Sequence, residues 1–224
     1  MLGRAAVAMW WDISPEVHAE FEDWHTHEHM PERLSIPGFL RGTRWIALSG
    51  ELSYFILYEA ARWATITSGA YVDRLNDPTP WSQKIMPHHR NMVRSLCRVR
   101  AGFGGGVPAA MATLRFSPSR GKASALSGWL SEILPQFAKR KGLTSGHLLV
   151  STKPADPART KEQEIRGNDV AADWIVLIGG YEAEAVQAAV AGELGEGAFA
   201  EHGAANRTVG VYRPAYSLAA RDMA

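Results

Sequence analysis

The order of predicted secondary structure along this chain of 224 residues repeats itself, and this repetition limits the fold more than any other feature. The apolar patterns of the first half predict strands at 5–13, 39–48, 53–60 and 93–102, and helices at about 14–33, 61–75 and 80–92. Those of the second half predict strands at 109–117, 143–152, 174–180 and 207–216, and helices at 122–140 and 183–194. Each half thus reads strand, helix, strand, strand, helix, strand. An internal duplication of this kind predicts an α+β protein made of two similar βαββαβ repeats.

A glycine-rich segment separates the two halves. Residues 102–108 contain four glycines and end in a proline, a composition that suits neither a helix nor a central strand. The predicted parts are a first repeat at 1–103, a linker at 104–108 and a second repeat at 109–224. Two glycine pairs support the duplication, namely Gly38 with Gly42 and Gly142 with Gly146. Both pairs stand at the beginning of the second strand of their repeat.

One charged segment has no counterpart in the first half. It is an insertion at about 153–169, rich in proline, lysine, arginine and glutamate. One interpretation is a solvated loop with a short helical turn, which we expect to be more mobile than the strands it joins. The alternative is a lid whose Arg159, Lys161 or Arg166 closes over an anionic substrate.

Composition limits the partners of the chain. Its 24 Lys and Arg residues nearly balance 23 Asp and Glu residues, so charge indicates no nucleic-acid or membrane partner. The single cysteine, Cys97, cannot form an internal disulfide and suits a reducing compartment, so we expect a cytoplasmic protein. The apolar stretch at 1–13 is interpreted as a first strand rather than a signal peptide. No apolar run reaches the roughly 20 residues that span a bilayer.

The densest group of chemically active side chains lies at the end of the first predicted helix. His25, Glu28 and His29 are the candidate catalytic residues. On an α-helix that advances 100° per residue, Glu28 continues the apolar stripe of Phe21 and Trp24 and should face the sheet. His25 and His29 should lie beside it, whereas His27 should point elsewhere.

Three interpretations of this group remain open. A histidine with a pKa near 6.5 suits general acid or base catalysis, with Glu28 fixing its tautomer. His25 and His29 could instead ligate a metal or haem iron, with Glu28 or the distant pair His88 and His89 completing the shell. In the third interpretation the imidazoles only cap the last carbonyls of a helix, where the helix dipole favours them.

Other residues are candidates for substrate binding. Tryptophans could form the walls of a pocket for a flat ligand, and arginines could bind a carboxylate or phenolate. The candidate substrate-binding residues are Trp10, Asp12, Trp24, Arg41, Arg44, Trp45, His88 and His89. Cys97 is interpreted as an inert core thiol. The glycine run at 102–106 is not a phosphate-binding loop, because it lacks the Lys-Ser/Thr pair that follows the glycines of such loops.

The doubled βαββαβ order, together with Trp24, His29 and Pro31 at the end of the first helix, resembles the dimeric α/β-barrel superfamily of ferredoxin-like proteins, and most of all its EthD-like members. The resemblance implies two ferredoxin-like sheets packed face to face, here within one chain. It also implies small-ligand clefts between each sheet and its helices. Members include cofactor-free monooxygenases, polyketide cyclases, isomerases and haem-containing dehydratases. The second half lacks this histidine cluster and is expected to be a structural partner.

We therefore expect an enzyme that acts on a small aromatic or polyketide-like molecule by histidine acid/base chemistry, without an organic cofactor or metal. Isomerisation, cyclisation, lyase chemistry and cofactor-free oxygenation all need a positioned proton acceptor. The alternatives are a non-catalytic small-ligand-binding protein of the same fold and a metal-binding or haem-binding member. One chain should complete the barrel, which leaves homodimerisation through the outer surfaces open.

Overall fold

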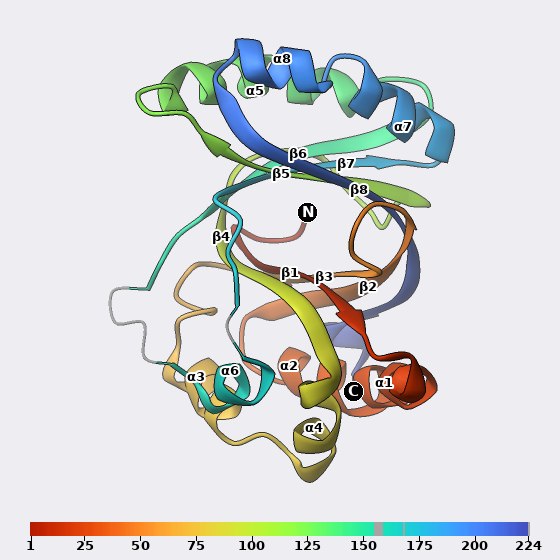
Figure 1. The fold of residues 1–224 in the computed structure, drawn as a ribbon, viewed down its shortest axis with the longest axis vertical. Coiled ribbons are helices and arrows are strands. Elements are labelled where there is room, and N and C mark those ends of the chain that lie inside the picture. Colours follow the sequence, from red (N-terminus) through yellow and green to blue (C-terminus); the bar gives the residue numbers. More distant parts are fainter. Residues whose placement is uncertain (155–158, 168, 224) are drawn as a thin grey trace.

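Eight antiparallel strands close into one barrel in the computed structural model, which describes residues 1–154, 159–167 and 169–223 (Figure 1). The strands are β1 (Ala5–Ile13), β2 (Phe39–Ser49), β3 (Tyr54–Ala60), β4 (His89–Gly104), β5 (Ala110–Pro118), β6 (Leu143–Ser151), β7 (Trp174–Gly180) and β8 (Ala204–Ala219). Their order around the barrel is β1-β3-β2-β8-β5-β7-β6-β4.

The barrel consists of two sheets of identical topology. The first has the order β4-β1-β3-β2 and the second the order β8-β5-β7-β6, so each places its own strands in the ferredoxin-like order of fourth, first, third and second. The last strand of each repeat, β4 and β8, is 16 residues long. Because of that length β4 pairs with both β1 and β6, and β8 pairs with both β2 and β5. The predicted fold, tandem ferredoxin-like repeats forming an intrachain dimeric α/β-barrel, is confirmed.

Alternate side chains of each strand enter different cores. On β1, Ala6, Ala8 and Trp10 point into the barrel, whereas Val7 and Trp11 pack against helices on its outer face. Both faces of this strand are therefore buried, which explains why its sequence is a nearly continuous apolar run rather than an alternating one. The barrel interior is an apolar core that also holds Cys97, whose pKa burial raises far above its usual value.

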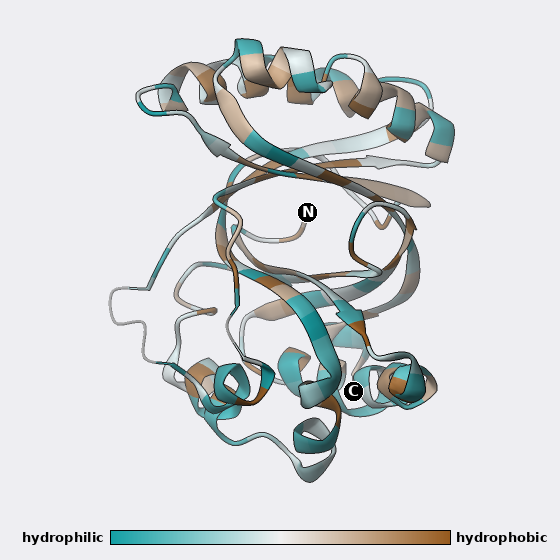
Figure 2. Cartoon of the chain, in the orientation of Figure 1, coloured by the Kyte–Doolittle hydropathy of each residue, from teal (hydrophilic) through white to brown (hydrophobic). Residues whose placement is uncertain are grey.

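Helices cover the two outer faces of the barrel in separate layers (Figure 1). Over the first sheet lie α1 (His18–Trp24), α2 (Met30–Leu34), α3 (Gly69–Asn76), α4 (Pro80–Ile85) and α6 (Lys161–Arg166). Over the second sheet lie α5 (Ala123–Phe137), α7 (Ala183–Ala191) and α8 (Glu196–Glu201). Short 3-10 turns are η1 (Pro15–Val17), η3 (Met86–His88) and η4 (Ala220–Asp222), and η2 (His25–His29) is a π-helical turn. Figure 2 shows hydrophobic residues in many of the strands around the barrel, whereas β4 is largely hydrophilic over its lower stretch and the helices carry residues of both kinds.

Several element bounds differ from the sequence prediction. The strand expected at 93–102 begins earlier, at His89, because His89 pairs with Ile13 and extends the ladder between β4 and β1. Pro87, which has no N–H to donate, lies in the 3-10 turn η3 that ends the preceding helix. Helix α3 starts at Gly69 rather than residue 61, and the short helix α8 was not predicted. These shifts come from long-range pairing and local turns that periodicity does not register.

The insertion and the predicted linker lie between well-defined strands. The insertion expected at 153–169 contains helix α6, while residues 155–158 and 168 lie outside the described residues. We expect the whole insertion to be more mobile than the strands, and part of the segment that this prediction concerns lies outside the described residues. Strand β4 ends at Gly104 and β5 begins at Ala110, and the division of the chain at 104–108 stays a proposal. Among the described residues no helix has both the length and the apolar character needed to cross a bilayer.

Equivalent glycines allow both repeats to bring a helix close to the sheet. Gly38 and Gly142 have φ angles of +95° and +83°, a conformation that a side chain disfavours. Gly42 lies against Met30, and a Cβ on Gly146 would stand 2.9 Å from the Leu134 carbonyl oxygen. The glycine pairs of the sequence therefore perform the same packing role in each half.

This packing role predicts that Gly142→Ala destabilises the protein. The new methyl group would occupy a positive-φ position and collide with Ala185, so we expect a loss of about 1–3 kcal/mol in the free energy of unfolding. Gly128→Ala is the control, because Gly128 lies in helix α5 with open space around it, and alanine there should stabilise by about 0.5–1 kcal/mol. Urea denaturation followed by circular dichroism measures both changes, and equal midpoints for the two variants would contradict this account.

Candidate active site

A proline creates the unusual turn that carries the histidines. Pro31 has no N–H, so it cannot donate the α-helical hydrogen bond to the His27 carbonyl. The preceding residue, Met30, instead donates its N–H to the His25 carbonyl five residues back, which makes His25–His29 a π-helical turn between α1 and α2. Such turns are rare and occur often at functional sites.

The π-helical turn directs His25 and His29 toward the sheet but not Glu28. His25 and His29 are buried, and His27 is exposed, as the sequence predicted. The expectation that Glu28 faces the sheet is wrong. Its Oε1 accepts hydrogen bonds from Trp24 Nε1 at 3.1 Å and from Thr79 Oγ1 at 2.5 Å, on the side of α4. A rotation of 100° per residue does not hold through a π turn, and Thr79 supplies a donor that the sequence pattern did not reveal.

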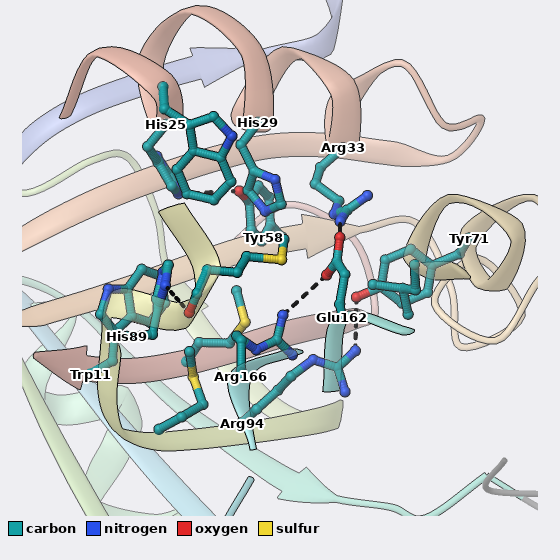
Figure 3. Close-up of a pocket in the computed structure, with 15 residues that line it drawn as sticks. Trp11, His25, His29, Arg33, Tyr58, Tyr71, His89, Arg94, Glu162 and Arg166 are labelled. Carbon is teal, nitrogen blue, oxygen red and sulfur yellow. Dashed lines mark hydrogen bonds and ion pairs between the residues drawn. The ribbon is translucent and has the colours of Figure 1, made fainter. Parts of the chain in front are cut away.

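The two buried histidines open onto a small enclosed space between the first sheet and its helices, called here the chamber (Figure 3). Its lining comprises the imidazoles of His25, His29 and His89, the guanidinium groups of Arg33, Arg94 and Arg166, the Glu162 carboxylate, the rings of Trp11, Trp24, Tyr58 and Tyr71, and the apolar side chains of Met9, Leu75, Met86 and Met92. The free space is about 20 Å³, which is room for about one water molecule.

All three imidazoles of the chamber are neutral at pH 7. Loss of hydration in the interior lowers the pKa of His25 and His29 well below the usual value, and the nearby cations Arg44 and Arg33 lower them further. Burial lowers the pKa of His89 to about 3. Each imidazole therefore has one nitrogen with a free lone pair that can accept a proton.

The protein fixes the tautomer of His89. Its Nδ1 lies 3.1 Å from the Met86 carbonyl oxygen, which can only accept, so Nδ1 carries the hydrogen and Nε2 keeps the lone pair. His25 Nε2 lies 3.4 Å from the Tyr58 hydroxyl. The ring of His29 stacks on that of Trp24 with the ring centres 4.4 Å apart. Since Glu28 holds the Trp24 indole nitrogen, it fixes the position of His29 from outside the chamber.

Helix α6 closes the chamber with charge from the second repeat. The Glu162 carboxylate accepts hydrogen bonds from Arg33 and from Arg166 Nη1, the latter at 3.1 Å, and Arg166 Nη2 also lies 3.3 Å from Asp169 (Figure 3). Of the three cations considered for a lid, Arg166 lines the chamber, whereas Lys161 lies on the exposed outer side of α6. Arg159, just before the helix, is exposed as well. Helix α6 of the insertion thus has one side exposed to solvent, which carries Lys161, and one side that covers the chamber, which carries Glu162 and Arg166.

Several buried polar atoms of the chamber have no hydrogen-bond partner among the described residues. They are Trp11 Nε1, His25 Nδ1, His29 Nδ1, Arg33 Nη1 and Arg166 Nε. Two of them lie near a carboxylate without a hydrogen bond to it, because Glu32 Oε2 is 3.5 Å from Arg33 Nη1 and 3.7 Å from His29 Nδ1. An unsatisfied buried polar group costs about 1–3 kcal/mol, so a cluster of them is unusual in a site that only stabilises the fold. Donors dominate the cluster, which suits a ligand rich in acceptor oxygens.

Two predicted substrate-binding residues lie on the other side of the sheet. Trp10 and Trp45 fill the barrel interior, where Trp10 stacks on Phe55 and donates from Nε1 to Thr113 Oγ1 at 3.1 Å. Strand alternation places these rings opposite to Trp11, so they cannot form a wall of the chamber. Their expected contact with a ligand stays a prediction that the chamber does not support.

Four further candidates also lie outside the chamber. Their partners are Ser53 and Asn91 for Asp12, Glu59 for Arg41, the Glu22 carbonyl for Arg44, and Glu16 for His88. Arg44 acts on the site only through its charge, which lowers the pKa of His25. Among the predicted substrate-binding residues, Trp24 and His89 do line the chamber.

Sequence reasoning missed Arg33, Tyr58, Tyr71, Arg94 and Glu162. None of them belongs to a local motif that marks it as a site residue, although Arg33 directly follows the histidine cluster in sequence. Arg94 has the clearest signal, since it is a charged residue that alternates with apolar ones on a strand. Glu162 comes from an insertion 129 residues away from Arg33, and only the folded chain brings the two together.

The metal and haem interpretations have less support. Within residues 1–154, 159–167 and 169–223, no group of three or more His, Cys, Asp or Glu side chains is arranged to hold a metal ion. No catalytic step is therefore derived through either group.

The corresponding space in the second repeat is filled by apolar side chains. Helix α5 directs Leu126, Leu130 and Leu134 at the second sheet, and all three are fully buried. Phe137 completes this core at the end of the helix. Leucine and phenylalanine thus occupy the side of the second sheet where the first repeat presents histidine and arginine.

Solved structures share this architecture over nearly the whole chain. An anthrone oxidase-like protein has a TM-score of 0.67 at 10% identity, covering 98% of this chain and 94% of that chain. A candidate monooxygenase from Fusobacterium nucleatum has a TM-score of 0.63 at 6% identity, covering 98% and 96%. A candidate chlorite dismutase has a TM-score of 0.54 at 12% identity, covering 100% and 98%. These likenesses show the dimeric α/β-barrel fold. No protein-family model and no curated protein matches the sequence.

The role of Glu162 predicts a large effect of Glu162→Gln on stability. The variant leaves the buried Arg33 and Arg166 without their shared carboxylate, so we expect a loss of about 3–5 kcal/mol in the free energy of unfolding. Glu164→Gln on the same helix is the control, because Glu164 pairs only with Lys161 and both side chains are exposed. Thermal unfolding compares the variants, and a Glu162→Gln protein as stable as Glu164→Gln would refute the role of the ion pair.

The buried imidazoles predict a protein that loses stability in acid. A histidine of the unfolded chain binds a proton near pH 6.5, whereas folded His89 does so only near pH 3. Between these values the unfolded state binds more protons than the folded state. The free energy of unfolding therefore decreases as the pH is lowered, by about 1.4 kcal/mol per pH unit for such a histidine. Urea denaturation at several pH values from 7 to 4 should show this decline.

Substitution isolates the contribution of one imidazole. His89→Gln cannot titrate and should make the decline less steep, whereas exposed His27→Gln should leave its slope unchanged. Carboxylates contribute equally to the slope in both variants. Identical slopes in wild type and His89→Gln would show that the imidazole is protonated in the folded protein.

Proposed function

We propose that the chamber transfers a proton to and from the reactive group of a small aromatic or polyketide-like molecule, with a buried imidazole as general base. Because the chamber has room for only about one water molecule, the body of the substrate would lie outside it. The observation that carries the proposal is His89, whose Nδ1 is tied to the Met86 carbonyl and whose Nε2 keeps its lone pair in an enclosed, aromatic-walled site. A neutral imidazole of fixed tautomer offers a proton acceptor in a defined position. With a pKa of about 3 it is a weak base until a substrate anion forms beside it. The proposal rests on this arrangement rather than on any resemblance.

The other chamber residues fit roles around that proton transfer. Removal of a proton from a phenolic or enolisable substrate leaves negative charge on its oxygen, and the Arg33 and Arg166 guanidinium groups stabilise such charge. The new anion lies beside the new imidazolium, which raises the pKa of His89 from its low value during the reaction. His25 and His29 are proposed as further catalytic groups that bind the substrate oxygen. Glu28 is proposed as a positioning residue that holds Trp24 against His29.

The reaction class is proposed from the chemistry of the anion. Isomerisation, cyclisation, lyase chemistry and cofactor-free oxygenation can all begin with the same deprotonation. The solved structures described as anthrone oxidase-like and as a candidate monooxygenase favour oxygenation. In that reaction the substrate carbanion adds to O2, and the resulting peroxide takes back the proton from the imidazolium, so that substrate and O2 together form a hydroperoxide.

The finer predictions from the sequence enter the same proposal. We propose an EthD-like protein of the cytoplasm that acts without an organic cofactor, on the basis of the motif Trp24, His29 and Pro31 and of the single buried cysteine. The chain completes its own barrel, and a homodimer would form through outer surfaces. The unpartnered donors of the chamber also support the alternative, a non-catalytic ligand-binding protein.

Hydrogen–deuterium exchange at carbon tests the proton transfer directly. Anthrone and 2-tetralone serve as probes, and the wild-type protein under nitrogen should accelerate exchange of their acidic C–H groups into D2O, as followed by NMR. His89→Gln should reduce the rate by about 100-fold or more, since general base catalysis contributes that much. His27→Ala, on the exposed face of η2, should behave as wild type. Oxygen uptake in air then separates oxygenation from the other reactions.

Full exchange activity in His89→Gln, with His25→Gln and His29→Gln also active, would eliminate the imidazoles as bases. Exchange no faster than in buffer for every probe would favour the non-catalytic alternative.

A further inference from the structure

A second and larger cleft lies next to the chamber. Its volume is about 420 Å³, within the range of small-molecule sites. The side chains of Ile66, Val72, Leu75 and Leu96 give it apolar walls. Tyr71, Leu75 and Arg94 line both spaces, so the cleft and the chamber adjoin at these three residues.

Arg94 differs from the other two arginines of the chamber. Arg33 and Arg166 share the Glu162 carboxylate, whereas Arg94 Nη2 donates to the Tyr71 hydroxyl at 2.9 Å (Figure 3). In the part of the chain that the structure describes, Arg94 forms no ion pair with a carboxylate. A cation in a mostly apolar environment without a counter-ion is costly, unless another molecule supplies the charge.

The acidic groups near Arg94 are engaged elsewhere. Asp169 lines the cleft, but it pairs with Arg166 at 3.3 Å and accepts a hydrogen bond from Gln163 at 3.4 Å. Glu162 bridges the other two arginines of the chamber. Burial alone would lower the pKa of Arg94, but the Tyr71 hydroxyl and the charges of these two carboxylates outweigh it and raise that pKa. Neither carboxylate forms an ion pair with Arg94 among the described residues, so its guanidinium remains available to an anion that enters through the cleft.

We infer that the cleft binds a small molecule with an apolar body and an anionic oxygen, a carboxylate or phenolate, and that Arg94 is the residue that binds this oxygen. The apolar body would lie along Ile66, Val72 and Leu96, with the anionic group where cleft and chamber meet. This inference deepens the proposed function by naming a substrate class, and it rests on that function only in taking the bound molecule as the substrate.

Calorimetry with a matched pair of probes tests the charge requirement. 2-Naphthoate and its uncharged amide, 2-naphthamide, have nearly the same shape. The wild-type protein should bind 2-naphthoate at least about tenfold more tightly than 2-naphthamide. A hydrogen bond between two charged groups accounts for a difference in affinity of this size. Equal affinity for the acid and the amide would overturn the inference without any variant.

Substitutions then locate the anion site. Arg94→Met keeps the apolar stem and should abolish the preference for naphthoate, and Arg94→Lys should restore part of it. Arg100→Met is the matched control, because Arg100 is an exposed arginine of the same strand and should leave the preference unchanged. A preference retained in Arg94→Met, or lost in Arg100→Met, would contradict the assignment. Circular dichroism verifies that each variant is folded.

The binding data and the exchange data can fail separately. Naphthoate binding involves no proton transfer, so His89→Gln should bind it normally even when that variant no longer catalyses exchange. Unchanged binding by Arg94→Met together with inactive His89→Gln would refute the anion site alone. Lost binding by Arg94→Met together with fully active histidine variants would refute the proposed chemistry alone.

Discussion

The pairing of β4 with β6 and of β2 with β8 is the constraint on which the rest of the structure depends. These two ladders use the free edges of both four-stranded sheets, so no strand edge is left exposed and the two halves have a fixed register. The interior of the closed barrel is then filled by its own large side chains, among them Trp10 and Trp45. Space for a ligand can therefore arise only on the outside of the sheets, beneath the helices, where the chamber lies.

Within that frame the two halves have become different. The first repeat presents imidazoles and guanidinium groups to the space under its helices, and the second fills the same space with Leu126, Leu130 and Leu134. The second repeat nevertheless contributes to the site, because its insertion supplies Glu162, the carboxylate that compensates Arg33. A buried guanidinium without such a partner would strongly destabilise the fold. The chamber is thus a joint product of both repeats although it lies in only one.

Local patterns in the sequence were sufficient to predict most of the fold, because strand alternation and glycine positions are local signals. Strands β1 and β7 have the predicted bounds, and the duplicated order holds throughout. The site was predicted less completely. His25 and His29 were found because they cluster in sequence, but Glu28 was misplaced, since the missing N–H of Pro31 changes the helical geometry. Arg94 and Glu162 stand among other charged residues, Arg90 and Arg98 for the first and Glu164 for the second, so that only tertiary contacts distinguish them.

The leucine-filled space under α5 also bears on binding stoichiometry. A barrel formed by two identical subunits must repeat every feature on both sides, so a substitution that improves one pocket appears twice. In a fused chain the two sides can vary independently. Here the first repeat has a polar chamber under its helices, and the second repeat has an apolar core in the equivalent place. The second repeat also contributes helix α6, which covers the chamber of the first. Among the described residues this barrel therefore forms one such chamber, where a symmetric dimer would form two.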